Sequence, residues 1–125
     1  MRYTFLIYLD EAKFAGMPPE ERDGYAAAMR DYDESLRQGG SLVFASALKL
    51  PREATTVRMW EGTLTATDGP FAETKEHLSG FIVVKARDMN DAIRMVSTMP
   101  LARTGSIEIR PIQERPFDKE AEREQ

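Results

Sequence analysis

The densest group of side chains that could do chemistry lies in one short stretch, residues 68–77. Its ionisable members are Asp68, Glu73, Lys75, Glu76 and His77. Two carboxylates in a partly dry cleft can have their pKa values pushed apart, as general acid–base chemistry requires. We therefore take Asp68 and Glu73 as candidate catalytic carboxylates, and Lys75 as a group that could steady an anion.

The same stretch has a structural interpretation, which stays open. Asp68-Gly69-Pro70 is typical of a turn, because aspartate bonds local backbone, glycine tolerates positive φ and proline fixes its own φ. The Glu73 carboxylate could pair with Arg58 or Arg110, in which case neither it nor Lys75 need meet a ligand.

Three further side chains each carry two interpretations. An unperturbed imidazole changes its charge near neutral pH, so His77 could be a pH-sensitive ligand contact, yet a single loop histidine is typical of a solvated surface. Trp60 and Phe71 could stack on a planar ligand, or they could pack in the core or at a contact between subunits. The sequence does not decide between these roles.

Composition excludes several classes of function. The chain has 125 residues, enough for one domain, and carries 17 basic against 21 acidic side chains, a net charge of −4. That balance lacks the positive field that nucleic acids require, so we expect no direct nucleic-acid contact. With no cysteine and one histidine, disulfides, thiolate nucleophiles, Fe–S clusters and multi-histidine metal sites are excluded. We expect no metal and no cofactor, although carboxylates alone could hold Mg²⁺ or Ca²⁺.

The N-terminal apolar run, residues 3–9, is far too short to cross a membrane and has the wrong layout for a signal peptide. We therefore expect a soluble, cytoplasmic protein. One domain is predicted over residues 1–115, followed by a charge-dense tail at 116–125 that is typical of a frayed or solvated segment.

Hydrophobic periodicity predicts six strands and two helices, which must position the candidate residues. The predicted strands are 2–9, 42–48, 55–60, 63–67, 80–84 and 106–112. The predicted helices run from 20 to 38, after Pro18-Pro19, and from 89 to 99, capped by Asp88 with Asp91 in the capping-box position. Residues 10–17 and 68–78 are predicted loops.

This order of elements predicts an α+β fold, a ferredoxin-like βαββαβ sheet with an extra β-hairpin and with both helices on one face. Strands 2–9 and 80–84 are apolar on both sides, so a sheet with helices on one face leaves an apolar face bare. We therefore predict a homodimer that packs sheet against sheet. Tyr8 and Asp10, at the end of the first strand, could face the resulting cleft.

The sequence DGPFAETKE at 68–76, followed by Gly80-Phe81, closely resembles the signature of the DGPF group within the YCII-related family. The resemblance extends to YTFLIY in the first strand, to TTVR from Thr55 and to GSIEIRP from Gly105, and leaves out only the tail. It implies a dimeric α+β barrel. Members of the wider family resemble enzymes that use a histidine–aspartate pair, in which the histidine lies on the first helix. In this chain the predicted first helix, residues 20–38, contains no histidine. The dyad therefore cannot be carried over.

Three hypotheses of function follow. The first is a small-molecule site in a dimer cleft lined by the DGPF loop, with Asp68 and Glu73 as possible acid–base groups; whether the chain is an enzyme stays open. Its predicted ligand contacts are Tyr8, Asp10, Gly69, Pro70, Phe71, Lys75 and Glu76. The alternative is a protein-interaction module associated with transcription initiation, which the resemblance allows because DGPF-type domains are sometimes joined to sigma-factor-like regions. The third is a loop that only locks the dimer.

Overall fold

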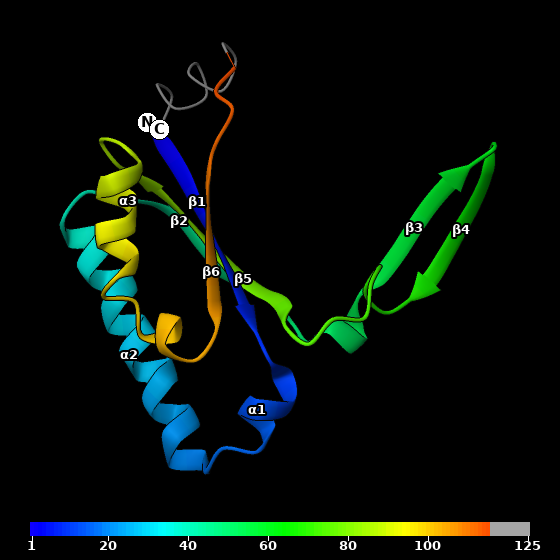
Figure 1. Ribbon diagram of the computed structural model, residues 1–125, viewed down its shortest axis with the longest axis horizontal. Coiled ribbons are helices and arrows are strands. Elements are labelled where there is room, and N and C mark those ends of the chain that lie inside the picture. The colour runs from blue at the N-terminus through cyan, green and yellow to red at the C-terminus, as the bar shows by residue number, and fades with distance from the viewer. Residues whose placement is uncertain (116–125) are drawn as a thin grey trace.

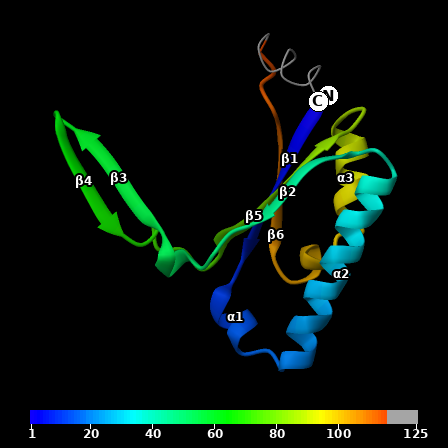
Figure 2. The ribbon, with the colours of Figure 1, turned by 180° about the vertical axis from the view of Figure 1, so that it is seen from behind.

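Six strands form two separate antiparallel sheets in the computed structural model, which describes residues 1–115. The first sheet has the order β2-β5-β1-β6, and the second is a hairpin of β3 and β4 that stands away from the rest (Figures 1 and 2). The strands are β1 (Arg2–Leu9), β2 (Leu42–Ala47), β3 (Thr55–Trp60), β4 (Thr63–Asp68), β5 (His77–Lys85) and β6 (Ser106–Pro111).

Two longer helices lie together on one face of the four-stranded sheet (Figure 1). They are α2 (Pro19–Gln38) and α3 (Met89–Val96), while a short helix, α1 (Glu11–Ala15), follows the first strand. Single 3-10 turns lie at Pro51–Glu53 and Pro100–Arg103. The element order and the strand order confirm the predicted ferredoxin-like α+β fold with an extra hairpin.

The core lies between the helices and the inner face of the sheet. Alternate residues of β1 and β5 point inward because side chains of a strand alternate between its faces. The buried hydrophobic residues are Tyr3, Phe5, Ile7, Tyr32, Ile82, Val84, Ala86, Ala92, Met95 and Met99. The register pairs Phe5 with both Ile82 and Ile109, so the neighbouring strands β5, β1 and β6 contribute to one apolar layer.

Two predicted loops were partly wrong. Residues 10–17 contain α1, whose five residues are too few to show an apolar period, although Asp10 caps it by accepting a 3.2 Å hydrogen bond from the Lys13 N–H. The loop predicted over 68–78 is shorter at both ends, because Asp68 belongs to β4 and β5 begins at His77. His77 therefore lies on a strand, paired with Leu9, rather than in a loop.

The start of α3 follows the prediction, but its end does not. Asp88 caps the helix by accepting a 2.8 Å hydrogen bond from the Asp91 N–H. The Asp91 carboxylate bonds the N–H of Arg87 at 3.0 Å and the guanidinium of Arg94 at 2.6 Å, which holds the pKa of Asp91 well below its usual range. The helix ends at Val96 rather than at 99, and Pro100 opens a 3-10 turn instead.

None of the helices in residues 1–115 is long and apolar enough to cross a membrane. The predicted charged tail, 116–125, lies outside the described residues.

Candidate functional site

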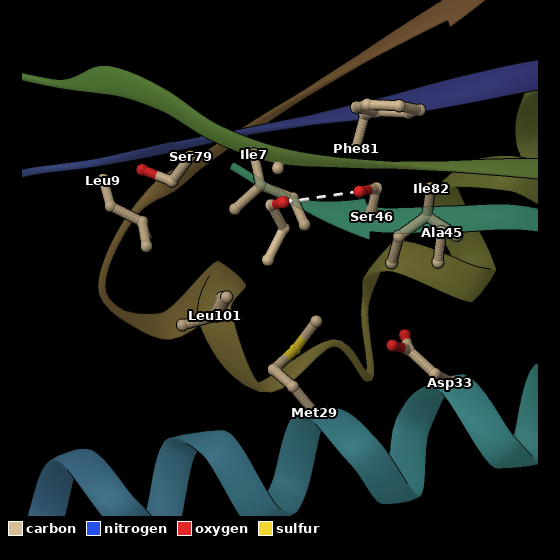
Figure 3. A pocket seen from close by; sticks show the side chains of 12 residues that line it. Ile7, Leu9, Met29, Asp33, Ala45, Ser46, Ser79, Phe81, Ile82 and Leu101 are labelled. Atoms are coloured by element: carbon tan, nitrogen blue, oxygen red, sulfur yellow. Dashed lines mark hydrogen bonds between the residues drawn. The ribbon is translucent and has the colours of Figure 1, made fainter. Parts of the chain in front are cut away.

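The first hollow of interest lies between α2 and the inner face of the sheet (Figure 3). We call it the inner pocket; its volume is about 210 Å³. Its lining is Ile7, Leu9, Met29, Asp33, Ala45, Ser46, Ala47, Ser79, Gly80, Phe81, Ile82 and Leu101. The lining is apolar except for two serines and one carboxylate, a composition common in sites for small organic molecules.

Asp33 supplies that carboxylate from α2. It lies one helical turn after Met29, and both side chains rise from the helix toward the sheet (Figure 3). Its Oδ1 atom is buried and has no hydrogen-bond partner among residues 1–115. Burial raises the pKa of Asp33 above its ordinary value. A buried carboxylate oxygen without a partner is costly, so it marks a place where a hydrogen-bond donor would bind well.

The two serines of the inner pocket are already engaged elsewhere. The Ser46 hydroxyl donates to the carbonyl of Ala47 at 3.3 Å, the dashed bond in Figure 3. The Ser79 hydroxyl donates to the carbonyl of His77 at 3.1 Å. Among the residues that line the inner pocket, Asp33 is the only ionisable one. Because both serine hydroxyls already donate to main-chain carbonyls, the Oδ1 atom of Asp33 is the polar atom that is free to accept a hydrogen bond from a ligand.

Gly80 explains how the sheet closes over the inner pocket. A Cβ at this position would lie 2.9 Å from the carbonyl oxygen of Ser46, so only glycine lets β2 approach β5 this closely. The next residue, Phe81, turns its ring away from the pocket (Figure 3). The Gly-Phe pair that follows the DGPF signature thus forms part of the pocket wall.

A second and larger hollow lies at the foot of the hairpin. We call it the loop groove; its volume is about 650 Å³. It is lined by Tyr8, Leu48, Lys49, Leu50, Pro51, Glu53, Ala54, Thr56, Pro70, Phe71, Ala72, Thr74, Glu76, His77 and Leu78. The structure therefore brings together four of the predicted ligand contacts, Tyr8, Pro70, Phe71 and Glu76, and adds His77.

The turn at the start of the DGPF loop closes the base of the hairpin. Gly69 has φ of +98°, and its N–H donates a 2.7 Å hydrogen bond to the carbonyl of Ala54. Its own carbonyl accepts a 2.8 Å bond from the hydroxyl of Thr56. Asp68, the last residue of β4, pairs with Thr55 and is exposed. These contacts agree with the structural interpretation of the turn.

Two further predicted contacts, Asp10 and Lys75, line a different hollow. A shallow hollow of about 500 Å³ is lined by Asp10, Lys13, Thr74, Lys75, Glu76 and Thr104. The Glu76 carboxylate accepts a 2.7 Å hydrogen bond from the Ser106 hydroxyl, which ties the loop to β6. Asp10 and Lys75 thus share a hollow that Tyr8 does not enter. Asp68 and Glu73 are exposed and line none of these three hollows.

The inner pocket and the loop groove adjoin. A hollow of about 260 Å³ between them shares Leu9 and Ser79 with the inner pocket. It shares residues 48–51 and His77 with the loop groove. His77 therefore lies where the loop groove meets this intermediate hollow.

Sequence reasoning missed Asp33, although the signal was present. The apolar stripe of α2 includes Met29 and Leu36, and Asp33 follows Met29 by four residues, on the face that packs on the sheet. A carboxylate at such a position is unusual and could have been singled out. Within residues 1–115, no group of three His, Asp or Glu side chains could hold a metal ion.

Comparisons with known proteins agree with this architecture. The model of the YCII-related domain matches residues 1–116. The chain belongs to the YCII-related family. It is 31% identical over 114 residues to an uncharacterized protein of Rhizobium meliloti, covering 90% of this chain and 92% of that one.

A solved structure shares the fold of this YCII-related chain at 12% identity, with a TM-score of 0.57, covering 94% of this chain and 98% of the other. It is the 5-chloro-2-hydroxyhydroquinone dehydrochlorinase of Burkholderia phenoliruptrix, in complex with 2,5-dihydroxybenzoquinone. At this identity the likeness shows a common fold.

Proposed function

We propose that this chain binds a small organic molecule in the inner pocket and that Asp33 holds the molecule by accepting a hydrogen bond. The observation that carries the proposal is the buried Oδ1 atom of Asp33, which has no partner among the described residues. A ligand that donates a hydrogen bond there would remove the cost of burying an unpaired carboxylate. Bonds to a charged acceptor are also stronger than neutral ones.

The lining defines the class of ligand. Apolar walls and a volume of about 210 Å³ suit a single ring, and the one carboxylate suits a neutral hydroxyl on that ring. The structural neighbour is in complex with a hydroxylated ring compound, which supports the same class. We propose that the loop groove receives any larger substituent, so that Tyr8, Phe71 and His77 contact the outer part of the ligand.

Asp33 is also suited to proton transfer. A carboxylate whose pKa is raised by burial is a better general base near neutral pH than a solvated one. In the proposed step, the ligand hydroxyl gives its proton to Asp33 and keeps the electron pair of its O–H bond. Asp68 and Glu73, the acid–base pair predicted from sequence, are exposed, so their catalytic role stays a prediction. The geometry favours Asp33.

The hypothesis of a transcription-linked interaction module likewise stays a prediction. Neither relative described above has a name that refers to transcription.

Hydroquinone, a neutral ring with two donor hydroxyls, is the probe for the test. Its binding is followed by NMR titration of wild type, of Asp33→Asn and of Asp31→Asn, whose exposed carboxylate on the same helix is the matched control. We expect saturable binding, shifts centred on the inner pocket and an affinity loss of about ten-fold in Asp33→Asn alone, or about 1.4 kcal/mol. Equal affinity of the two variants, or no saturable binding by wild type, would overturn the proposal.

A further inference from the structure

The intermediate hollow, of about 260 Å³, begins where one end of the inner pocket stops. The two hollows share Leu9 and Ser79 in their linings. Figure 3 shows these two residues at one end of the inner pocket and Asp33 at the other end. A ring whose hydroxyl meets Asp33 therefore turns its opposite side toward the intermediate hollow.

Most of the wall of the intermediate hollow is apolar. It is built from the end of β1, from α1 and from residues 48–51, the segment that follows β2. The ionisable residues of this lining are Glu11, Lys49 and His77. Apolar walls with a few polar groups accept an apolar chain, and the polar groups then fix what that chain carries.

The charges of this lining leave a positive group without a partner. The Glu11 carboxylate lies 3.6 Å from the guanidinium of Arg52 and is paired there. Among residues 1–115, the Lys49 ammonium and the His77 imidazole have neither a hydrogen bond nor an ion pair. An ammonium group only donates, and an imidazole carries at least one N–H in either protonation state. Two donors are therefore available to an acceptor on a ligand.

Strand pairing brings these two donors to the same end of the intermediate hollow. The N–H of Leu48 donates a 2.9 Å hydrogen bond to the carbonyl of Ser79. Because β2 and β5 are antiparallel, Lys49 and His77 both lie beyond this bond, in the same direction along the sheet. Both also line the loop groove, so they lie at the end of the intermediate hollow away from Asp33.

The separation of the two ends suits a ring with a short side chain. Figure 3 places Asp33 below Ala45 of β2, and Lys49 follows Ala45 by four residues. An extended chain rises about 3.4 Å per residue, so these four residues span about 13 Å. A ring with a short acidic chain, hydrogen-bonded at both ends, covers a length of this order.

We propose that the ligand of the inner pocket is a phenol with a short acidic side chain, and that Lys49 and His77 bind its carboxylate. Asp33 holds the phenol hydroxyl, so this inference rests on the proposed function and names its substrate class. A hydrogen bond from an ammonium to a carboxylate is charge-assisted and stronger than a neutral one. The apolar wall of the intermediate hollow covers the carbon chain between the ring and the acid.

The test compares two probes that differ only in charge. They are para-hydroxyphenylpropionic acid, an anion at pH 7, and its neutral primary amide. Binding is followed by NMR titration of wild type, Lys49→Gln, His77→Phe and Asp33→Asn, and the protein spectra show that each variant is folded. Lys13→Gln is the matched control, because Lys13 is an exposed lysine on α1 that does not line the intermediate hollow.

We expect wild type and Lys13→Gln to bind the acid about ten-fold more tightly than the amide. The preference for the acid should disappear in Lys49→Gln and should fall in His77→Phe, while both variants still bind the amide. Equal affinity of wild type for the two probes overturns the proposal, and so does a preference that Lys49→Gln retains. An unchanged preference in His77→Phe overturns the stated contact with His77.

The same titrations separate failure of this inference from failure of the proposed function. If wild type binds hydroquinone through Asp33 but does not prefer the acid to the amide, the inference alone is wrong. If the preference depends on Lys49 but Asp33→Asn binds the acid as tightly as wild type, the proposed role of Asp33 is wrong and the carboxylate contact stands.

Discussion

The phenol of Tyr32 on α2 donates a 2.8 Å hydrogen bond to the main-chain carbonyl of Met95 on α3, and so joins the two helices that cover the sheet. Burial, helped by the neighbouring charge of Asp33, raises the pKa of Tyr32 to about 12. Because Tyr32 is fixed against α3, the next residue, Asp33, is held facing the inner pocket (Figure 3). A structural contact thus orients the candidate ligand-binding carboxylate.

The first prediction concerns this bond. Tyr32→Phe keeps the ring but removes the donor, so the free energy of unfolding should fall by about 1 kcal/mol in urea denaturation at pH 7. In wild type, stability should also fall as pH rises from about 10, where an unfolded tyrosine ionises, to about 12. Tyr32→Phe should lack this contribution. Tyr25→Phe, whose ring packs on Phe14, is the control and should change little; an equal loss there would contradict the assignment.

The second prediction is that the protein becomes more stable when Asp33 is made apolar. Asp33→Leu removes a buried, unpaired carboxylate oxygen and should raise the free energy of unfolding by about 1–3 kcal/mol at pH 7. The folded-state pKa of Asp33 is raised, so the folded state binds the proton more tightly than the unfolded state. Wild-type stability should therefore fall as pH rises from about 3.9 through the folded-state pKa, whereas Asp33→Leu should show no such contribution.

Urea denaturation across this pH range measures the difference between wild type and Asp33→Leu. The gain should vanish below both pKa values, where Asp33 is neutral in either state. Asp31→Asn, an exposed site, should leave the profile unchanged. A loss of stability in Asp33→Leu at pH 7 would contradict the unpaired state of Asp33.

The third prediction contrasts two glycines. Gly69→Ala should destabilise the protein by about 1–2 kcal/mol, because φ of +98° disfavours any side chain even though there is space for a methyl group. Gly24→Ala should stabilise it by about 0.5–1 kcal/mol, since Gly24 lies inside α2 and a Cβ there would meet nothing. Thermal and urea denaturation check both signs. A stabilising Gly69→Ala would show that the turn is not required at the base of the β3–β4 hairpin.

Local sequence signals predicted most of the fold because they act over short distances along the chain. A run of aromatic and branched residues identified β1, two β-rich runs on either side of Glu61-Gly62 identified the hairpin, and the glycines after Gln38 marked the end of α2. The errors fell where a local period is too short or is overruled. Five residues cannot display the helical period of α1, and His77 joined β5 because β1 offered it a partner, Leu9.

The candidate site was less predictable than the fold. The sequence identified the DGPF stretch, and the structure gathered Tyr8, Pro70, Phe71 and Glu76 in the loop groove. It placed Asp10 and Lys75 in a different hollow, and left Asp68 and Glu73 exposed. Residues that are close in sequence were separated because Pro70 and Phe71 line one hollow and Lys75 lines another, and only the path of the loop in space decides which hollow each residue faces.

By itself, the sequence determined the family, the order of the elements and an apolar face that the helices leave bare, since these depend on residue types and their spacing. Only the tertiary structure decided that the Oδ1 atom of Asp33 is buried without a partner and that the β3–β4 hairpin stands clear of the body. Burial and hydrogen bonding depend on atoms brought together from distant parts of the chain. A carboxylate on α2 has the same local sequence whether water or the sheet faces it, so its chemistry is set by what packs against it.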